Sequence, residues 1–421
     1  MTETKDLNYA IELDRNDPLN SYRQKFHLPV RENGEQYLYF CGNSLGLQPK
    51  STSEFVNQEL EDWKMLGVEG HFRAKNPWMP YHEFLTNSLA KIVGAKPIEV
   101  VAMNALTVNL HLMMVSFYRP KGKRVKIMME ADAFPSDHYA VKSQLNFHGV
   151  SNEDGLILLK PREGEDTIRT EDILQIIEEQ GETIALIMIG GVNYYTGQLF
   201  DMKTITSAGH SKGCTVGFDL AHAVGNVKLE LHSWGVDFAV WCSYKYLNAG
   251  PGAVAGCFVN EKHASDSDLP RFSGWWGHDK ESRFTMPDDF VPIPTTESWQ
   301  LSNAPILSMA SLRASLAIFE EVGVEKLNAK SIKLTQFLQD LILAIGDSRI
   351  SIITPIDPNQ RGCQLSIRIA EIGREVFEEL EKLGVILDWR EPDVLRLAPV
   401  PLYNSFEDVF RFIDLLKRIL K

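Results

Sequence analysis

Between about residues 85 and 260, short apolar runs alternate with stretches that have a helical pattern of hydrophobic and polar positions. Apolar runs with few polar residues are typical of strands in a mainly parallel sheet covered on both faces. The runs that predict strands are Val125–Glu130, Ile184–Ile189, Thr215–Phe218, Phe238–Cys242 and Val254–Val259. Because these strands alternate with helices, the pattern predicts a layered α/β domain.

The pattern changes after Pro305, where helical stretches over residues 306–322 and 325–345 follow one another. The elements expected after them are strands Ile350–Ile353 and Gln364–Ile369, helix Glu375–Leu383, strands Val385–Asp388 and Val394–Leu397, and helix Glu407–Leu420. They predict a smaller α/β domain with an antiparallel sheet. We therefore expect an N-terminal arm and connector over residues 1–62 that joins the small domain, a large domain over 63–304 and a small domain over 305–421.

Composition narrows the class of protein. The chain has 421 residues, which is long for one hydrophobic core, and its formal net charge is −13. An acidic chain is not expected to bind nucleic acid or an anionic membrane as its main partner, and no apolar run approaches the length of a membrane span. Its five cysteines are scattered and form no Cys-x-x-Cys motif. We therefore expect reduced thiols, no metal site and a cytoplasmic protein.

Two of the apolar runs end in residues that can do chemistry. Asp219 follows Val216–Phe218, and Lys245 follows Phe238–Cys242. Lys245 comes 26 residues after Asp219, a separation that allows one loop or helix between two adjacent strands. A carboxylate that holds a pyridinium N–H and a lysine that forms a Schiff base are the way a protein holds pyridoxal phosphate. Most lysines are solvated surface charges, but a buried lysine is a usable nucleophile toward carbonyls.

Further candidates lie near expected element ends, and each has a structural alternative. Thr107 opens an apolar helix whose N-terminus can bind an anion, although a threonine there can be a plain N-cap. Phe134 can stack on a cofactor ring, whereas Ser136 and Asp137 can also be helix start signals. His222 can hydrogen-bond a cofactor or be a satisfied core histidine.

Arg396 and an irregular segment complete the set of candidates. Arg396 is a charge inside the apolar strand Val394–Leu397 and needs a carboxylate partner, either in the protein or on a substrate. The segment from Trp275 to Pro294 is rich in glycine, proline and aromatic residues. Long irregular stretches of this kind in compact proteins are usually functional.

The motifs around these residues together resemble the kynureninase family over roughly residues 37 to 421. They are Asn104–His111, Phe134–Tyr139, Gly217–Asn226, Trp241–Gly250 and Arg396–Asn404. The resemblance implies an α/β enzyme of pyridoxal-phosphate fold type I, similar to aspartate aminotransferase. The implied reaction is hydrolysis of the Cβ–Cγ bond of kynurenine or 3-hydroxykynurenine to an anthranilate and alanine, in tryptophan degradation and NAD biosynthesis.

The resemblance also implies the cofactor-binding residues. Lys245 carries the covalent link to the cofactor, Asp219 meets the pyridine nitrogen, and Tyr244 lies near the phosphate as the expected acid that protonates Cβ. The other residues implied are Leu106, Thr107, Phe134, Pro135, Ser136, Asp137, His222, Trp275 and Asn303. In the family the last two come from the partner subunit, so a homodimer with shared active sites is implied.

The substrate-binding residues follow in the same way. Arg396 matches the arginine that binds the substrate α-carboxylate, and Ser44, His71 and Asn303 match positions around the substrate ring in animal-type enzymes. Polar groups there can hydrogen-bond a ring hydroxyl, so we expect a preference for 3-hydroxykynurenine; alternatively, His71 merely packs in a loop. One departure from the family lies at Gly190, where members can have a serine that contacts the phosphate.

Three other functions fit parts of this pattern: a cysteine desulfurase, an aminotransferase and a cofactor-binding regulator without catalysis. A desulfurase needs a mobile reactive cysteine, and none of the five cysteines lies in an evidently flexible polar loop. An aminotransferase would convert its cofactor to the amine form with ordinary amino acids and a keto acid. A regulator is disfavoured because Lys245 and Tyr244 are both present and no DNA-binding appendage is evident.

Overall fold

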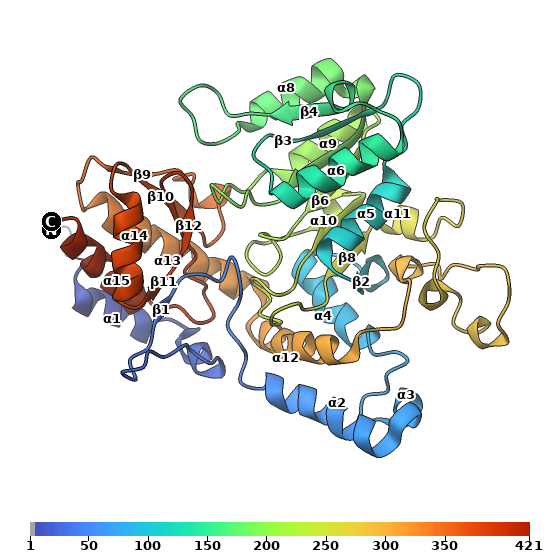
Figure 1. The fold of residues 1–421 in the computed structure, drawn as a ribbon, viewed down its shortest axis with the longest axis horizontal. Helices are drawn as coiled ribbons and strands as arrows, with labels where there is room; N and C mark the ends of the chain where they lie inside the picture. Colours follow the sequence, from blue (N-terminus) through green and yellow to red (C-terminus); the bar gives the residue numbers. More distant parts are fainter. Residues whose placement is uncertain (1–4) are drawn as a thin grey trace.

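A seven-stranded sheet is the largest feature of the protein, which is described over residues 5–421 by a computed structural model (Figure 1). Its strand order is β2-β8-β7-β6-β5-β3-β4. The strands are β2 (Val100–Ala102), β3 (Lys126–Glu130), β4 (Leu156–Leu159), β5 (Ile184–Gly190), β6 (Thr215–Asp219), β7 (Phe238–Trp241) and β8 (Gly256–Val259). Strands β4, β3, β5, β6 and β7 run parallel, and β8 runs antiparallel to its neighbours β7 and β2. The mainly parallel sheet predicted from the apolar runs is confirmed.

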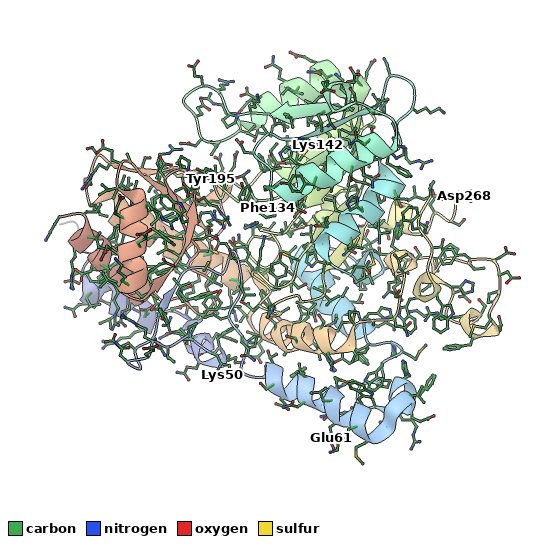
Figure 2. All side chains as sticks on the ribbon, viewed as in Figure 1. Lys50, Glu61, Phe134, Lys142, Tyr195 and Asp268 are labelled. Carbon is green, nitrogen blue, oxygen red and sulfur yellow. The ribbon has the colours of Figure 1, made fainter. Side chains whose placement is uncertain are left out.

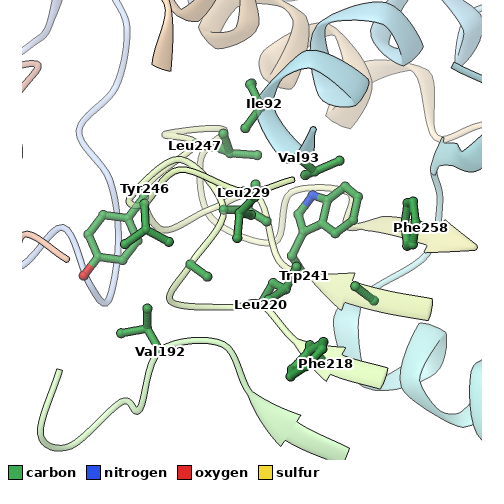
Figure 3. Close-up of a cluster of buried hydrophobic side chains, with 14 of the residues drawn as sticks. Ile92, Val93, Val192, Phe218, Leu220, Leu229, Trp241, Tyr246, Leu247 and Phe258 are labelled. Carbon is green, nitrogen blue, oxygen red and sulfur yellow. The ribbon is translucent and has the colours of Figure 1, made fainter. Parts of the chain in front are cut away.

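Both faces of this sheet are buried, which explains why its strands have no polar alternation. On β7, Phe238 and Val240 pack into one hydrophobic cluster, and Trp241 packs into the cluster on the other face. Figure 3 shows Trp241 beside Phe258 in the second cluster. A Cβ atom at Gly256 would lie 2.3 Å from the Trp241 indole, so this close approach requires glycine.

Helices cover both faces of the large sheet. The helices of this part are α2 (Thr52–Leu66), α3 (Gly70–Arg73), α4 (Glu83–Val93), α5 (Leu106–Phe117), α6 (Pro135–Phe147), α7 (Asn152–Gly155), α8 (Thr170–Gln180), α9 (Met202–Ser211), α10 (Leu231–Trp234) and α11 (Glu261–Ala264). The buried residues of α5 and α6 belong to one cluster, and those of α4, α8 and α9 belong to the other. The expected layered α/β architecture is therefore present.

A second, four-stranded sheet has the order β12-β13-β10-β9 and is antiparallel throughout, as predicted. Its strands are β9 (Ile350–Ile352), β10 (Leu365–Ile369), β12 (Asp388–Arg390) and β13 (Val394–Leu397). The helices of this part are α1 (Leu7–Arg15), α12 (Ile306–Val322), α13 (Val324–Leu343), α14 (Gly373–Lys382) and α15 (Phe406–Ile419). Helices α1, α13, α14 and α15 share one hydrophobic cluster with this sheet, whereas α12 packs against α2 and α4.

The strand predicted over Val385–Asp388 is wrong as a single element. Residues Val385–Ile386 form β11, which pairs in parallel with β1 (Leu38–Tyr39), and Asp388 begins the separate strand β12. Leu387 between them is 5% exposed, so the apolar run continues through the point where the chain changes sheets. The break has a functional consequence, because the antiparallel register of β12 sets Asp388 directly opposite Arg396.

The segment from Trp275 to Pro294 is irregular, as expected, and contains the short helical turns η5 (Trp275–Gly277) and η6 (Arg283–Thr285). A third short turn, η7 (Thr296–Trp299), follows it. Among the described residues, no helix combines the length and the apolar composition that crossing a membrane requires.

Candidate active site

The carboxyl ends of the central parallel strands meet at one edge of the large sheet and line a cavity. They bring Glu130 from β3, Gly190 from β5 and Asp219 from β6 beside Lys245, which lies in the loop after β7. The cavity opens to solvent and has about 600 Å³ of empty space. Ligands of open α/β sheets bind at this edge because the strand ends converge there and leave backbone groups unpaired.

Lys245 and His222 are in direct contact in this cavity. Lys245 Nζ lies 2.9 Å from His222 Nε2 and 5.9 Å from the centre of the Phe134 ring. Burial holds the pKa of His222 well below its usual value, and the positive charge of Lys245 adds to this effect. A neutral His222 accepts from Lys245 through Nε2, so its hydrogen is on Nδ1, which is buried without a partner among residues 5–421.

Three carboxyl groups line the same cavity. Asp219 accepts a hydrogen bond of 2.7 Å from the Ala221 N–H, and burial raises its pKa. Burial and the negative charges of Asp219 and Glu130 raise the pKa of Asp137 well above its usual value. Burial also raises the pKa of Glu130 to about 7, and its Oε1 accepts from the Gly190 N–H at 3.0 Å.

The opposite wall of the cavity offers hydrogen-bond donors. Helix α5 begins at Leu106 without a side-chain cap, and α6 begins at Pro135, also without one. Thr107 Oγ1 and Ser136 Oγ, from the first turns of these helices, lie 3.0 Å apart. Uncapped N–H groups together with two hydroxyls make a site suited to a phosphate group.

The structure brings nine of the expected residues around the cavity. They are Leu106, Thr107, Phe134, Ser136, Asp137, Asp219, His222, Tyr244 and Lys245. Pro135 lies in the first turn of α6 between two lining residues. Figure 2 labels Phe134 and Tyr195 on the side of the large sheet that faces the small sheet.

Three other expected residues lie away from this cavity. Trp275 is 41% exposed in η5, and Asn303 lines a separate hollow beside the start of α12. His71 Nδ1 lies 2.9 Å from the Val68 carbonyl oxygen in the same short segment, and the His71 ring meets the edge of Trp78. Within a single chain, Trp275, Asn303 and His71 therefore do not lie at the Lys245 cavity.

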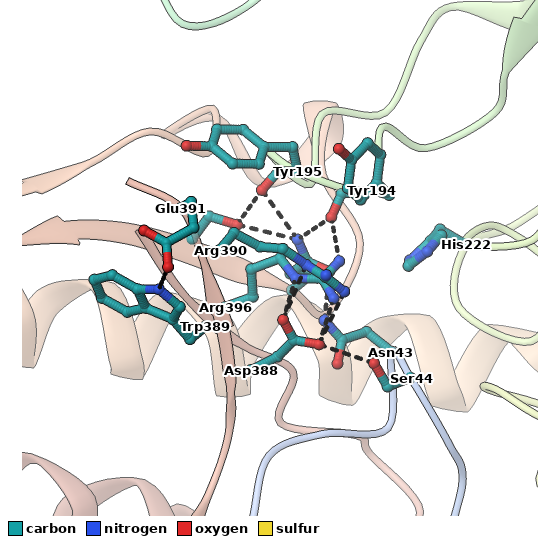
Figure 4. Close-up of polar contacts among 12 residues, drawn as sticks. Asn43, Ser44, Tyr194, Tyr195, His222, Asp388, Trp389, Arg390, Glu391 and Arg396 are labelled. Carbon is teal, nitrogen blue, oxygen red and sulfur yellow. Dashed lines mark hydrogen bonds and ion pairs between the residues drawn. The ribbon is translucent and has the colours of Figure 1, made fainter. Parts of the chain in front are cut away.

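Arg396 is joined to the cavity wall through a polar network shown in Figure 4. The Arg396 side chain is 1% exposed; its Nη2 donates to Asp388 Oδ2 at 2.6 Å and its Nη1 donates to the Tyr194 carbonyl at 2.6 Å. Ser44 Oγ donates to the same Asp388 carboxylate at 2.9 Å. The carboxylate that Arg396 requires is therefore present in the protein, and Tyr194 connects the network to the cavity.

Relatives with known names resemble this chain over almost its whole length. The kynureninase of Koribacter versatilis is 57% identical over 407 residues, covering 97% of this chain and 96% of that protein. The kynureninase of Nematostella vectensis is 51% identical over 435 residues, covering 98% and 94%. The family model described as the kynureninase C-terminal domain matches residues 327–416.

The chain belongs to the kynureninase family. Among solved structures, a cysteine desulfurase from Thermococcus onnurineus NA1 superposes with a TM-score of 0.76 at 16% identity, covering 97% of each chain. The cystine C–S lyase C-DES superposes with a TM-score of 0.75 at 15% identity, covering 90% of this chain and 97% of that one. At such identities these likenesses concern the fold alone, and they confirm the expected fold type I.

For this kynureninase family member, sequence reasoning missed several residues at or near the cavity. Glu130 ends a buried strand with a carboxylate, which is the same signal that pointed to Asp219. The sequence did not identify Asp388 as a site residue, because Asp388 was expected to end a continuous strand. No sequence signal identified Tyr194 or Arg390, because their position depends on how the two sheets meet.

A second cluster of potential ligand atoms involves His82, Glu83 and Glu297, whose atoms lie within 4.8 Å of one another. Lys280 Nζ lies 2.8 Å from Glu83 Oε1 and 2.7 Å from Glu297 Oε2. In this family member, a lysine ammonium therefore supplies the positive charge that these carboxylates require.

Proposed function

We propose that this chain is a pyridoxal-phosphate-dependent hydrolase that converts L-kynurenine and L-3-hydroxykynurenine to anthranilate or 3-hydroxyanthranilate plus L-alanine. The observation that carries the proposal is a cavity lined by Lys245 and the buried Asp219, with Arg396 held at its wall through Tyr194. Family membership over nearly the whole chain supports the same reaction.

The residues around the cavity fit this cofactor. Lys245 would hold it covalently, Asp219 would face the ring nitrogen, and Thr107 with Ser136 would bind the phosphate at the N-termini of α5 and α6. One buried feature supports the fit: among residues 5–421, His222 Nδ1 has no hydrogen-bond partner. When bound, pyridoxal phosphate withdraws electrons from the bonds at the substrate α-carbon and stabilises negative charge there.

Leu106, Phe134 and Pro135 complete the cofactor-binding side of the proposal. Phe134 lines the cavity and is 47% exposed, so we propose that its ring stacks on the cofactor ring. Leu106 lines the cavity at the first position of α5, and Pro135 shapes the start of α6.

The chain's own residues then orient the substrate and move protons. Arg396 would bind the α-carboxylate, and the Lys245 amine, directed by neutral His222, would move the proton at the α-carbon. Burial raises the pKa of Tyr244, so its hydroxyl keeps its proton at neutral pH and can donate it to Cβ after cleavage. Replacing Tyr244 by Phe should slow turnover while cofactor absorbance stays largely intact.

The reaction is tested by incubating the purified protein with pyridoxal phosphate and 3-hydroxykynurenine. Equal amounts of 3-hydroxyanthranilate and alanine are expected, and Lys245→Ala should lower the rate at least about a thousandfold because it removes the covalent link and the base. Transfer of the amino group to a keto acid instead would indicate an aminotransferase. Release of sulfide from cysteine would indicate a desulfurase.

We also propose that a second copy of the chain completes each active site, because Trp275 and Asn303 lie away from the Lys245 cavity of their own chain. Lys245→Ala and Trp275→Ala chains should each be inactive alone. Co-expressed, they should regain up to about a quarter of wild-type activity, since half the dimers are mixed and each mixed dimer has one intact site. No recovery in purified mixed dimers would place Trp275 in the site of its own subunit.

The preference for 3-hydroxykynurenine rests on His71, Ser44 and Asn303. Ser44 donates its hydroxyl hydrogen to Asp388, so it can only accept a hydrogen bond from a ring hydroxyl. We expect kcat/KM to be higher for 3-hydroxykynurenine than for kynurenine and the ratio to fall in His71→Ala. Equal specificity constants in the wild-type protein would contradict this preference.

A further inference from the structure

We propose that Arg390 is a second substrate-binding cation, which acts beside Arg396 on the α-carboxylate and makes the site selective for substrates that carry this group. The proposal rests on the proposed function and concerns a residue to which the resemblance assigns no role. Three observations support it: the placement of the two arginines, the balance of charge around them and their position beside Tyr194, which lines the cavity.

The register of the small sheet sets the two guanidinium groups on one carboxylate. Asp388 lies directly opposite Arg396 across β12 and β13, and Arg390 lies two residues beyond Asp388, on the same face of β12. Asp388 pairs with Arg396 at 2.6 Å and with Arg390 Nε at 3.0 Å (Figure 4). One carboxylate therefore fixes the direction of both side chains.

The network has one more positive charge than it has negative charges. Over residues 5–421, Asp388 is the only carboxylate that pairs with either arginine. The nearby Glu391 carboxylate accepts from the Trp389 indole at 3.0 Å, as Figure 4 shows. Asp393 pairs with Arg368 instead. Two guanidinium groups with one carboxylate are balanced when a second carboxylate binds, and the α-carboxylate of an amino acid supplies it.

The excess positive charge lies beside a residue that lines the cavity. The guanidinium carbons of Arg396 and Arg390 lie 5.7 and 6.0 Å from the centre of the Tyr194 ring, which lines the cavity. Both positive charges also reach His222, where they contribute to lowering the pKa of its imidazole. The positive charges of the network therefore affect the cavity that contains Lys245.

Arg390 is the more accessible of the two cations. Its side chain is 36% exposed, whereas the Arg396 side chain is 1% exposed and already donates through Nε, Nη1 and Nη2. Among the described residues, the Arg390 side chain donates one hydrogen bond, from Nη2 to Asp388 at 3.2 Å. Its Nη1 is therefore available to a ligand, while Arg396 has fewer free donors.

The test compares two ligands that differ only in the α-carboxylate: L-kynurenine and its decarboxylated amine. Their apparent dissociation constants are measured on the holoenzyme by rapid mixing, from the concentration dependence of the first spectral change before turnover, in wild type, Arg390→Gln and Arg390→Lys. Arg349→Gln is the matched control, because Arg349 has a similarly exposed side chain (33%), pairs with Asp347, and precedes β9 at the far edge of the small sheet.

Arg390→Gln should weaken L-kynurenine binding about tenfold and change binding of the amine less than about twofold, because a charge-assisted contact is lost only with the carboxylate. Arg390→Lys should recover most of the affinity, and Arg349→Gln should alter neither constant. Equal weakening for both ligands, or no weakening for either, would overturn the proposal. Wild-type protein that binds L-kynurenine without releasing anthranilate would contradict the proposed reaction. The affinities of the Arg390 variants for the two ligands would still test the role of Arg390.

Discussion

Lys245 Nζ and His222 Nε2 lie 2.9 Å apart, so the amine is hydrogen-bonded to a histidine that burial keeps neutral. The two residues come from the loops after neighbouring strands β7 and β6. The contact directs the lysine without adding a second positive charge. The protonation state of His222 can therefore be used to test this arrangement.

His222 is expected to remain neutral across the physiological pH range. Burial and the adjacent positive charge of Lys245 hold its pKa well below the usual value, so its ring 15N shifts should not change between about pH 5 and pH 8. NMR of protein labelled at histidine, with His222→Asn to assign the signal, measures this. A midpoint near pH 6.5 would contradict it.

The lowered pKa of His222 also predicts how the stability of the protein depends on pH. A histidine whose folded pKa is lowered contributes stability above its unfolded pKa, and this contribution is lost as the pH falls below about 6.5. The free energy of unfolding of wild type should therefore decrease more than that of His222→Asn between about pH 7.5 and pH 5. Urea unfolding of both proteins at the two pH values provides the comparison.

Glu130 should affect stability in the opposite direction. Burial raises its folded pKa to about 7 from the usual value of 4.5, so its contribution to stability is present below about pH 4.5 and is lost as the pH rises through 7. Relative to wild type, Glu130→Gln should gain about 3 kcal/mol of unfolding free energy between pH 5 and pH 8. A difference that does not vary with pH would mean that Glu130 is ionised throughout.

A side chain at Gly190 is expected to displace the Glu130 carboxylate. A Cβ atom at Gly190 would lie 2.9 Å from Glu130 Oε1, which the Gly190 N–H itself holds in place. Gly190→Ala should therefore cost about 1 kcal/mol or more of unfolding free energy. Adding the shorter Glu130→Asp should reduce this cost; strictly additive costs in the double variant would show that the two positions do not interact.

Asp237 is expected to be a main contributor to stability at the edge of the sheet opposite to the cavity. Its buried carboxylate accepts from His210 and His263 at 2.8 Å each and pairs with Lys262 at 2.7 Å. Burial alone would raise the pKa of Asp237, but these partners outweigh burial and hold the pKa well below its usual value.

Asp237→Asn should therefore lower the free energy of unfolding by about 3 kcal/mol at pH 7, because it leaves buried donors without their charge partner. Since the folded pKa is lowered, the advantage of wild type over Asp237→Asn should shrink as the pH falls below about 4. Urea unfolding at pH 7 and pH 3.5 measures both effects. An advantage that stays constant over this range would contradict the assignment.

Much of the large sheet could be predicted because its strands are buried on both faces and appear as continuous apolar runs. Strands β2 and β4 were not predicted; they are the two edge strands of this sheet, and β4 contains the exposed Leu158. Strands β9, β10 and β13 of the small sheet were predicted, but β12 was not, because burial continues through Leu387 at the break between β11 and β12. The boundary proposed at residue 305 stays a prediction, since α12 packs against α2 and α4.

The candidate site could be predicted where residues follow directly on strand or helix ends, as Asp219, Lys245 and Thr107 do. Residues such as Asp388 and Arg390 could not, since their position depends on strand register and on the meeting of two sheets. The spacing of residues along the sequence does not show where the two sheets come together. The roles proposed for Trp275 and Asn303 depend further on a second chain, which one sequence cannot place.

The pairing of β1 with β11 joins Leu38 to Val385, near opposite ends of the chain. During synthesis on a ribosome, the first strand has no partner until almost the whole polypeptide has been made. The large sheet, whose strands all lie between residues 100 and 259, has no such delay. The antiparallel sheet that holds Arg396 also waits for its last strand, so the site is assembled only at the end of translation.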